Sequence, residues 1–217
     1  TIPKCLRPYF IHNRTLFSNI SHLIFNLIQD YYNEVSGQAI SSGLLLSHQT
    51  FGDFVKPTPH WHGILIEGGF DEEGNFVYLP ILRTQQMTEL FRRKVIKYFE
   101  ENKLINTDFA KNLLSWKNSG FSIDNSVKIF GSDQKARKSL AQYIARCPIS
   151  LDKITYEAFH GRIIFKTPKY NNYFKENFRV FDALEFIALV TAHIPPKHKQ
   201  LIRRYGLYAS RSRGKWD

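Results

Sequence analysis

Two short apolar segments, 43–51 (GLLLSHQTF) and 60–67 (HWHGILIE), constrain the fold more than any other feature of the sequence. Their length and composition predict strands, and the loop 52–59 between them contains two prolines. Segments 20–32 and 84–104 flank the pair, and their apolar residues recur with helical spacing. The turn-rich segment 68–75 is suited to closing a hairpin. This order predicts an α+β fold with a central antiparallel sheet and flanking helices.

Shorter segments complete the predicted outline. Residues 2–10 are interpreted as a strand or extended segment, 121–130 as a strand and 156–166 as a hairpin. A helix capped by Ser132 runs to about Cys147, before Pro148. A second amphipathic helix spans 181–194 and is followed by a basic tail. We therefore expect one domain over residues 1–170, with residues 171–217 as its helical, basic C-terminal extension.

The charge balance favours a polyanionic partner. Lys and Arg number 30 against 19 Asp and Glu, a formal net charge of +11, which suits nucleic acid or an anionic membrane surface. No apolar run reaches the roughly 18 residues of a membrane span, so nucleic acid is the favoured partner and no membrane is expected. Cys5 and Cys147 are too few for a disulfide framework, which favours a reducing cytoplasm. A start on Thr1 without a signal peptide suggests a fragment.

His60 and His62 are two residues apart on a predicted strand, so both imidazoles face the same side of the sheet. Trp61 then points into the opposite, packed face. The preceding strand carries His48 and Gln49, of which only one can face the histidines. Either would complete a three-ligand site that leaves positions for water and a phosphate oxygen. A site with one amide oxygen is compatible with Mg²⁺ or Mn²⁺, whereas nitrogen ligands alone would favour zinc. The alternative to a metal site is a pair of histidines with a structural role only.

Tyr143 lies on the helix predicted before Pro148, at the edge of its apolar face. Arg146 follows by three residues, which makes the two side chains neighbours on a helix. A tyrosine acts as a nucleophile where its target is polarised and its proton is handled, and Arg146 could hold a phosphate oxygen. The alternative interpretation is an ordinary amphipathic tyrosine beside a solvated arginine.

Taken together, these segments resemble one family, the HUH-endonuclease transposases of the insertion sequence ninety-one type. Six ordered motifs carry the resemblance, over nearly the whole chain: the opening segment 1–7, QTFG at 49–52, PHWH at 59–62 with EGGF at 67–70, YIARCPIS at 143–150, HIPP at 193–196 and YGLY at 205–208. The family places Gln or His before Thr-x-Gly, which prefers Gln49 over His48.

The resemblance implies a function for each of these sites. Gln49, His60 and His62 would bind Mg²⁺ or Mn²⁺, and Tyr143 would attack a phosphodiester of single-stranded DNA at transposon ends and target. The product would be a covalent 5′-phosphotyrosine, so that strands are nicked and rejoined during transposition. Arg146, with Arg203, Arg204 and Arg211 of the basic tail, would contact the DNA backbone. Residues 1–170 would be the HUH nuclease domain, in a prokaryotic, nucleoid-associated protein.

Two departures from the family pattern restrict the function that the resemblance implies. Two-tyrosine members carry a second tyrosine four residues before the first, where this chain has Ser139, so it resembles the single-tyrosine variety. The cysteine-rich N-terminal module of many members is missing from this chain. The alternatives are a degenerate transposase remnant that binds single-stranded DNA without cleaving it, and an unrelated metal hydrolase that uses water as its nucleophile.

Overall fold

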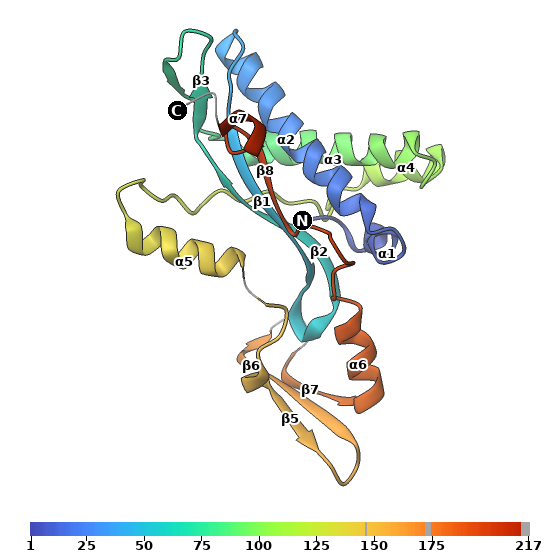
Figure 1. Cartoon of the computed structure of the whole chain (residues 1–217). Helices are drawn as coiled ribbons and strands as arrows, with labels where there is room; N and C mark the ends of the chain where they lie inside the picture. Colours follow the sequence, from blue (N-terminus) through green and yellow to red (C-terminus); the bar gives the residue numbers. More distant parts are fainter. Residues whose placement is uncertain (146, 172–174, 214–217) are drawn as a thin grey trace.

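The computed structural model describes residues 1–145, 147–171 and 175–213. It is an α+β fold whose strands form antiparallel sheets, as predicted (Figure 1). The strands are β1 (Gly43–Phe51), β2 (Pro57–Leu65), β3 (Gly68–Phe70), β4 (Phe76–Tyr78), β5 (Ile154–Glu157), β6 (Arg162–Asn171), β7 (Glu176–Asp182) and β8 (Ile202–Gly206). The α-helices are α1 (Arg7–His12), α2 (Thr15–Ser36), α3 (Thr84–Glu101), α4 (Thr107–Ser115), α5 (Gln134–Ile144), α6 (Ala183–Thr191) and α7 (Ser210–Arg213). Short 3₁₀ helices lie at Lys4–Leu6, Asp53–Val55 and Leu151–Lys153.

The central sheet has the order β2-β1-β8, with β1 in the middle. β1 pairs with β2 from Leu44↔Leu65 to Gln49↔His60, and with β8 from Gly43↔Gly206 to Ser47↔Ile202. The ladder between β1 and β8 therefore ends at Ser47, and the last part of β1 has β2 as its strand neighbour only. Helix α2 lies along one face of this sheet, and α5 lies on the other side (Figure 1). The hairpin β3–β4 joins the chain before β1 through the bridge Ser41↔Phe70.

The main core lies between the central sheet and helices α1, α2 and α3. Phe99 is fully buried there, with ring centroids 5.5 Å from Tyr9 and 6.1 Å from Phe10. Trp61 projects from β2 into the same core and donates a hydrogen bond of 3.0 Å to Ser21 Oγ. The predicted orientation of Trp61 is confirmed, and its neighbours His60 and His62 are left on the opposite face of the sheet.

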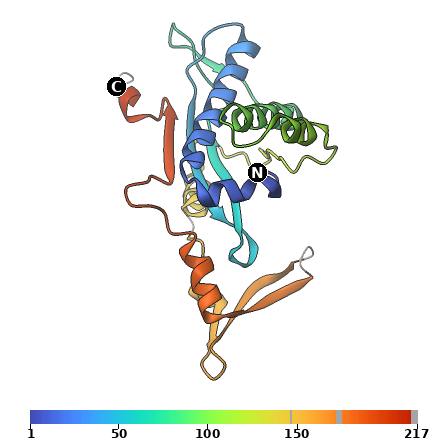
Figure 2. The same ribbon diagram turned by 90° about the vertical axis from the view of Figure 1, so that its right-hand side faces the viewer.

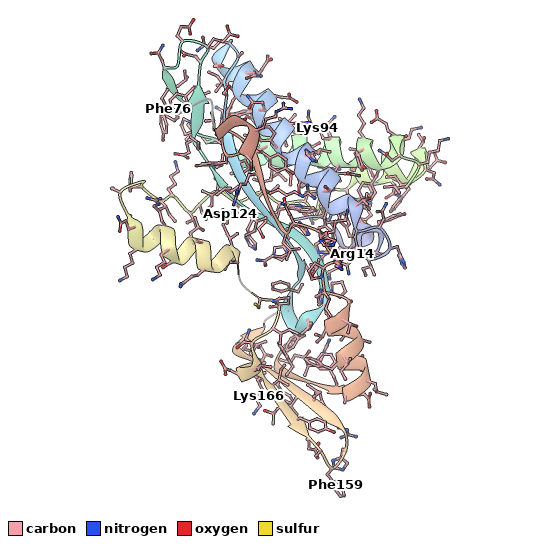
Figure 3. The ribbon with its side chains drawn as sticks, in the orientation of Figure 1. Arg14, Phe76, Lys94, Asp124, Phe159 and Lys166 are labelled. Carbon is pink, nitrogen blue, oxygen red and sulfur yellow. The ribbon has the colours of Figure 1, made fainter. Side chains whose placement is uncertain are left out.

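Phe99→Ala is expected to lower the free energy of unfolding by about 3–5 kcal/mol, because it leaves a cavity among fully buried rings. Denaturant-induced unfolding followed by circular dichroism measures the change. Phe159→Ala is the matched control, because Phe159 is 91% exposed at the tip of the β5–β6 hairpin (Figure 3) and should shift stability by less than about 0.5 kcal/mol. Equal effects of the two substitutions would contradict this assignment of the core.

A second, smaller unit is formed by the antiparallel sheet β5-β6-β7 and helix α6, which project beyond one end of the central strands (Figure 2). Phe165, Phe181 and Phe186 form its core. The turn between β1 and β2 inserts Phe54 and Val55 into this core, and both residues have positive φ, 52° and 59°. Since Val is strained in this region, packing on the second unit must hold the turn in shape.

Three predictions about secondary structure were wrong. Residues 4–12 form a 3₁₀ turn and helix α1 in place of a strand, and Ile2, Leu6 and Phe10, each four residues apart, are fully buried. Segment 121–130 forms no strand and follows the surface, with Phe121 packed on the main core. The C-terminal part contains α6 as predicted but also the strands β7 and β8, so it is not simply helical.

The other predictions about secondary structure were confirmed, with shifts at the ends of elements. The strand over 43–51, the helix beginning at Thr84 and the hairpin β5–β6 all form. Helix α5 forms too, although Asp133 caps it in place of Ser132 by accepting a hydrogen bond from the Ala136 N–H. None of the described helices combines the length and the apolar character that a membrane span requires.

Candidate active site on the central sheet

Strands β1 and β2 bring three predicted site residues to one face of the sheet. Gln49 lies directly opposite His60, and His62 lies opposite Ser47, so all three side chains point to the same side. The imidazole ring centroids of His60 and His62 are 4.8 Å apart. His48 points to the opposite face, where its ring stacks on Phe17 at 4.6 Å. The structure therefore places Gln49, and not His48, beside the two histidines.

Tyr143 reaches the same face from helix α5. Its ring centroid lies 5.0 Å from that of His62, with an interplanar angle of 79°. Gln49 Nε2 donates a hydrogen bond of 3.4 Å to the Ile144 carbonyl, and Ile144 is buried, so the last turn of α5 is held against β1. Tyr143 itself remains 51% exposed, which leaves its hydroxyl open to a large substrate. Two neighbouring strands and a helix about seventy residues later thus form one cluster of Gln49, His60, His62 and Tyr143.

The surroundings of both histidines favour the neutral imidazole. Burial lowers the pKa of His60, and burial together with the neighbouring His60 lowers the pKa of His62. His60 Nδ1 lies 2.7 Å from the Thr58 carbonyl oxygen, which can only accept, so Nδ1 carries the proton. Nε2 of His60 then presents a lone pair. Neutral imidazole with one nitrogen fixed by a backbone carbonyl is the form that binds metals.

The donor set at this cluster fits a divalent cation. Gln49 uses its amide Nε2 toward Ile144, which leaves Oε1 as an oxygen donor beside the two imidazoles. Among the described residues, no group of three or more His, Cys, Asp or Glu side chains is arranged to hold a metal. A metal at this cluster would therefore depend on the Gln49 amide as its third protein ligand. One oxygen and two nitrogen donors suit Mn²⁺ and Mg²⁺ better than a site with nitrogen alone would.

The described arginines predicted to bind DNA do not all lie on the face of the sheet that carries the cluster. Arg204 is opposite Leu45, which places it on the same face of the sheet as Gln49, whereas Arg203 is opposite Leu46 and points to the other face. Arg211 lies in α7, which follows the end of β8 paired with Gly43, at the far end of β1 from Gln49 (Figure 1). The structure does not bring Arg211 to the cluster, and Arg146 lies outside the described residues.

Two further residues support the site. Arg7 of α1 donates a hydrogen bond of 3.4 Å to Thr58 Oγ1 and is close enough for its charge to act on His60. Sequence reasoning missed Arg7 because its segment was interpreted as a strand. His193, the first residue of the HIPP motif, is buried, and its Nε2 donates to the Val55 carbonyl at 2.7 Å. Its Nδ1 accepts from the Thr50 hydroxyl at 2.9 Å, so His193 is fully engaged in holding the β1–β2 turn.

Comparisons with known proteins point to a transposase. Residues 43–215 match the model of the family described as "Putative transposase". The whole chain is 24% identical to the transposase for insertion sequence element IS801 of Pseudomonas savastanoi pv. phaseolicola, and the aligned region is 54% of that protein. The chain thus spans about half the length of this curated relative. No solved structure gives a significant match.

Proposed function

This chain belongs to that transposase family, and from this premise we propose that it nicks and joins single-stranded DNA by the HUH-endonuclease mechanism. The observation that carries the proposal is the cluster itself, in which the Tyr143 ring lies 5.0 Å from His62, beside His60 and Gln49. A nucleophile and a set of metal ligands on one face of a sheet have the arrangement that phosphodiester cleavage needs. The single-tyrosine variety fits, because Ser139 occupies the position four residues before Tyr143.

In the proposed reaction, the number of bonds to the scissile phosphorus stays the same. Tyr143 Oη forms a bond to the scissile phosphorus while the bond from phosphorus to the 3′ oxygen breaks. The proton lost by the phenol is balanced by the one that the leaving 3′ oxygen gains. The products are a 5′-phosphotyrosine and a free 3′-hydroxyl, and attack by another 3′-hydroxyl reverses the step and joins two strands without ATP.

Other residues of the chain position the reacting groups. Gln49, His60 and His62 would hold Mg²⁺ or Mn²⁺, which when bound polarises the scissile phosphate and offsets its negative charge. The Thr58 carbonyl fixes the orientation of the His60 ring. The contact between Gln49 and the Ile144 carbonyl holds the end of α5, and so Tyr143, near the histidines. Arg204 lies on the same face of the sheet and would contact the DNA backbone.

Incubation with labelled single-stranded DNA and Mn²⁺ tests the proposal. The expected result is a protein–DNA adduct that survives denaturation, together with a DNA fragment that carries a 3′-hydroxyl. Binding without any adduct would support the alternative of a transposase remnant that has lost cleavage. Cleavage without an adduct would instead support a metal hydrolase in which water is the nucleophile.

Gln49→Ala is expected to weaken Mn²⁺ binding by at least about 10–100-fold, the usual effect of losing a residue that only supports a metal ligand, because it removes a direct oxygen donor and a contact that holds α5. Gln49→Glu keeps an oxygen donor and should retain Mn²⁺ binding, although it loses the hydrogen bond to Ile144. Titration of Mn²⁺ followed by electron paramagnetic resonance compares the two variants with the wild type. Gln29→Ala serves as the control, because Gln29 lies on α2 and bonds to the Ile40 carbonyl, away from the cluster. Unchanged Mn²⁺ affinity in Gln49→Ala would exclude Gln49 from the ligand set.

A further inference from the structure

A pocket of about 210 Å³ opens along the free edge of β1, next to the proposed active site. β8 covers β1 only as far as Ser47, and one further hydrogen bond joins the His48 N–H to the Leu201 carbonyl at 3.2 Å. The pocket begins where this pairing stops and is lined by residues 47–51 of β1. On one side it is closed by the first turn of α2, and on another by the loop that leads into β8.

The pocket is strongly cationic. Arg14, Lys199 and Arg203 line it, and none of its described lining residues is Asp or Glu. No ion pair with any of these three cations is formed among the residues that the structure describes. The guanidinium groups of Arg14 and Arg203 are close enough to His48 for their charges to act on its imidazole ring. Because like charges gathered without a counter-charge repel one another, this arrangement favours a bound anion.

Two further observations point to a ligand. Arg14 is partly buried, and burial lowers its pKa, so its charge is held partly out of water at a cost that an anion would offset. Nδ1 of His48 is buried and has no hydrogen-bond partner among the described residues. Unpartnered buried polar atoms are uncommon in folded proteins, and a bound molecule is one way to supply the missing partner. Figure 3 shows Arg14 beside the strands of the central sheet.

The position of the pocket indicates which anion it binds. Its lining includes Gln49 of the cluster and Ile144 and Ala145, the two residues that follow Tyr143. A strand of DNA whose phosphate lies at Tyr143 would pass directly beside this pocket. Apolar side chains, including Phe51, Pro148 and Pro195, line the rest of it. The volume is below the roughly 300–1,000 Å³ of pockets that enclose a drug-sized ligand, so the pocket has room for one nucleotide at most, with part of that nucleotide outside it.

We propose that this pocket binds one nucleotide of the DNA strand adjacent to the scissile phosphate, with its backbone phosphate held by Arg14, Lys199 and Arg203. The inference rests on the proposed function, because it assumes that the cluster acts on single-stranded DNA. In this arrangement Arg203 binds DNA within the pocket, whereas Arg204 lies on the opposite face of the sheet. The DNA would thus be held on both sides of β1, which fixes which phosphodiester lies at Tyr143.

The test measures the binding of a fluorescein-labelled oligothymidylate by anisotropy, at several NaCl concentrations and with EDTA present to prevent cleavage. Arg203→Gln is expected to weaken binding about tenfold, the effect of losing one charged hydrogen bond. It should also reduce the slope of log Kobs against log salt by about 0.7, the value for one phosphate contact to a single strand. Lys199→Gln, at an exposed position where folding is not at risk, should reduce the slope in the same direction.

Arg93→Gln is the matched control, because Arg93 is an exposed arginine on α3 that pairs with Glu89 and lies outside the pocket. It should leave affinity and slope unchanged. Free thymidine 5′-monophosphate should displace the oligonucleotide only weakly, and less still from Arg203→Gln. Thymidine monophosphate that binds as tightly as the oligonucleotide would indicate a free-nucleotide site and overturn the proposal. Pocket variants that match Arg93→Gln would overturn it as well.

Failure of this inference is distinguishable from failure of the proposed function. A wild-type chain that binds no oligothymidylate and forms no adduct would contradict the proposed function itself. A wild-type chain that binds and forms the adduct, with pocket variants unchanged in affinity and salt slope, would contradict only the assignment of the pocket.

Discussion

Tyr143→Phe is expected to abolish the covalent protein–DNA adduct and to reduce strand cleavage by at least about a thousandfold. The substitution removes one oxygen atom, and that atom is the proposed nucleophile, so no 5′-phosphotyrosine can form. The loss should be far larger than that from any positioning residue, since the remaining residues cannot supply the missing bond. Denaturing gel electrophoresis of labelled DNA after reaction with Mn²⁺ measures both the adduct and the free product.

The fold should be unaffected, because Tyr143 is half exposed and its hydroxyl has no hydrogen bond to the described residues. Tyr156→Phe is the matched control, since Tyr156 is 59% exposed on β5, in the separate second unit. It should form the adduct at the wild-type rate. Adduct formation by Tyr143→Phe would show that another residue is the nucleophile, and undiminished cleavage without an adduct would identify water in that role.

The fold could be predicted from sequence where local pattern decides structure. The apolar run of β1 and the helical spacing of α3 depend on neighbouring residues alone, and both predictions were confirmed. β8 was missed because five residues containing Arg203 and Arg204 form a strand only by pairing with β1, about 160 positions earlier in the chain. The prediction for residues 2–10 was wrong for a different reason. The apolar residues of so short a segment fit the periodicity of a helix as well as that of a strand.

For the site, too, features set by neighbouring residues could be predicted, and features set by residues far apart in the chain could not. The alternation of a strand was enough to predict that His60 and His62 converge, and that Trp61 points away. The choice between His48 and Gln49 depended on the register of β1 against β2, which no local pattern determines. The proximity of Tyr143 to His62 could be predicted only through the family resemblance, because α5 follows β2 by some seventy residues without regular pairing to it. The pocket beside β1 combines residues from the start of α2 and the loop before β8, so it had no sequence signature.

Joint replacement of both histidines, His60→Ala with His62→Ala, is expected to lower cleavage by about a thousandfold and to remove its dependence on metal. A divalent cation at a phosphate supplies several kcal/mol of charge stabilisation, and 1.36 kcal/mol corresponds to tenfold in rate. EDTA should have the same effect on the wild type, with activity restored by Mn²⁺. The double variant should gain nothing from Mn²⁺ at any concentration, while keeping Tyr143 and the cationic pocket.

Metal binding can be separated from catalysis by thermal unfolding without DNA. A cation that binds only the folded chain stabilises it by about 2.7 kcal/mol at one hundred times its Kd, so Mn²⁺ should raise the Tm of the wild type. The double variant should show no such rise. His160→Ala should behave like the wild type, because His160 is exposed and pairs with Glu157 in the second unit. A Tm that Mn²⁺ raises equally in the wild type and the double variant would place the metal elsewhere, and the neutral imidazoles of His60 and His62 would then have a structural role only.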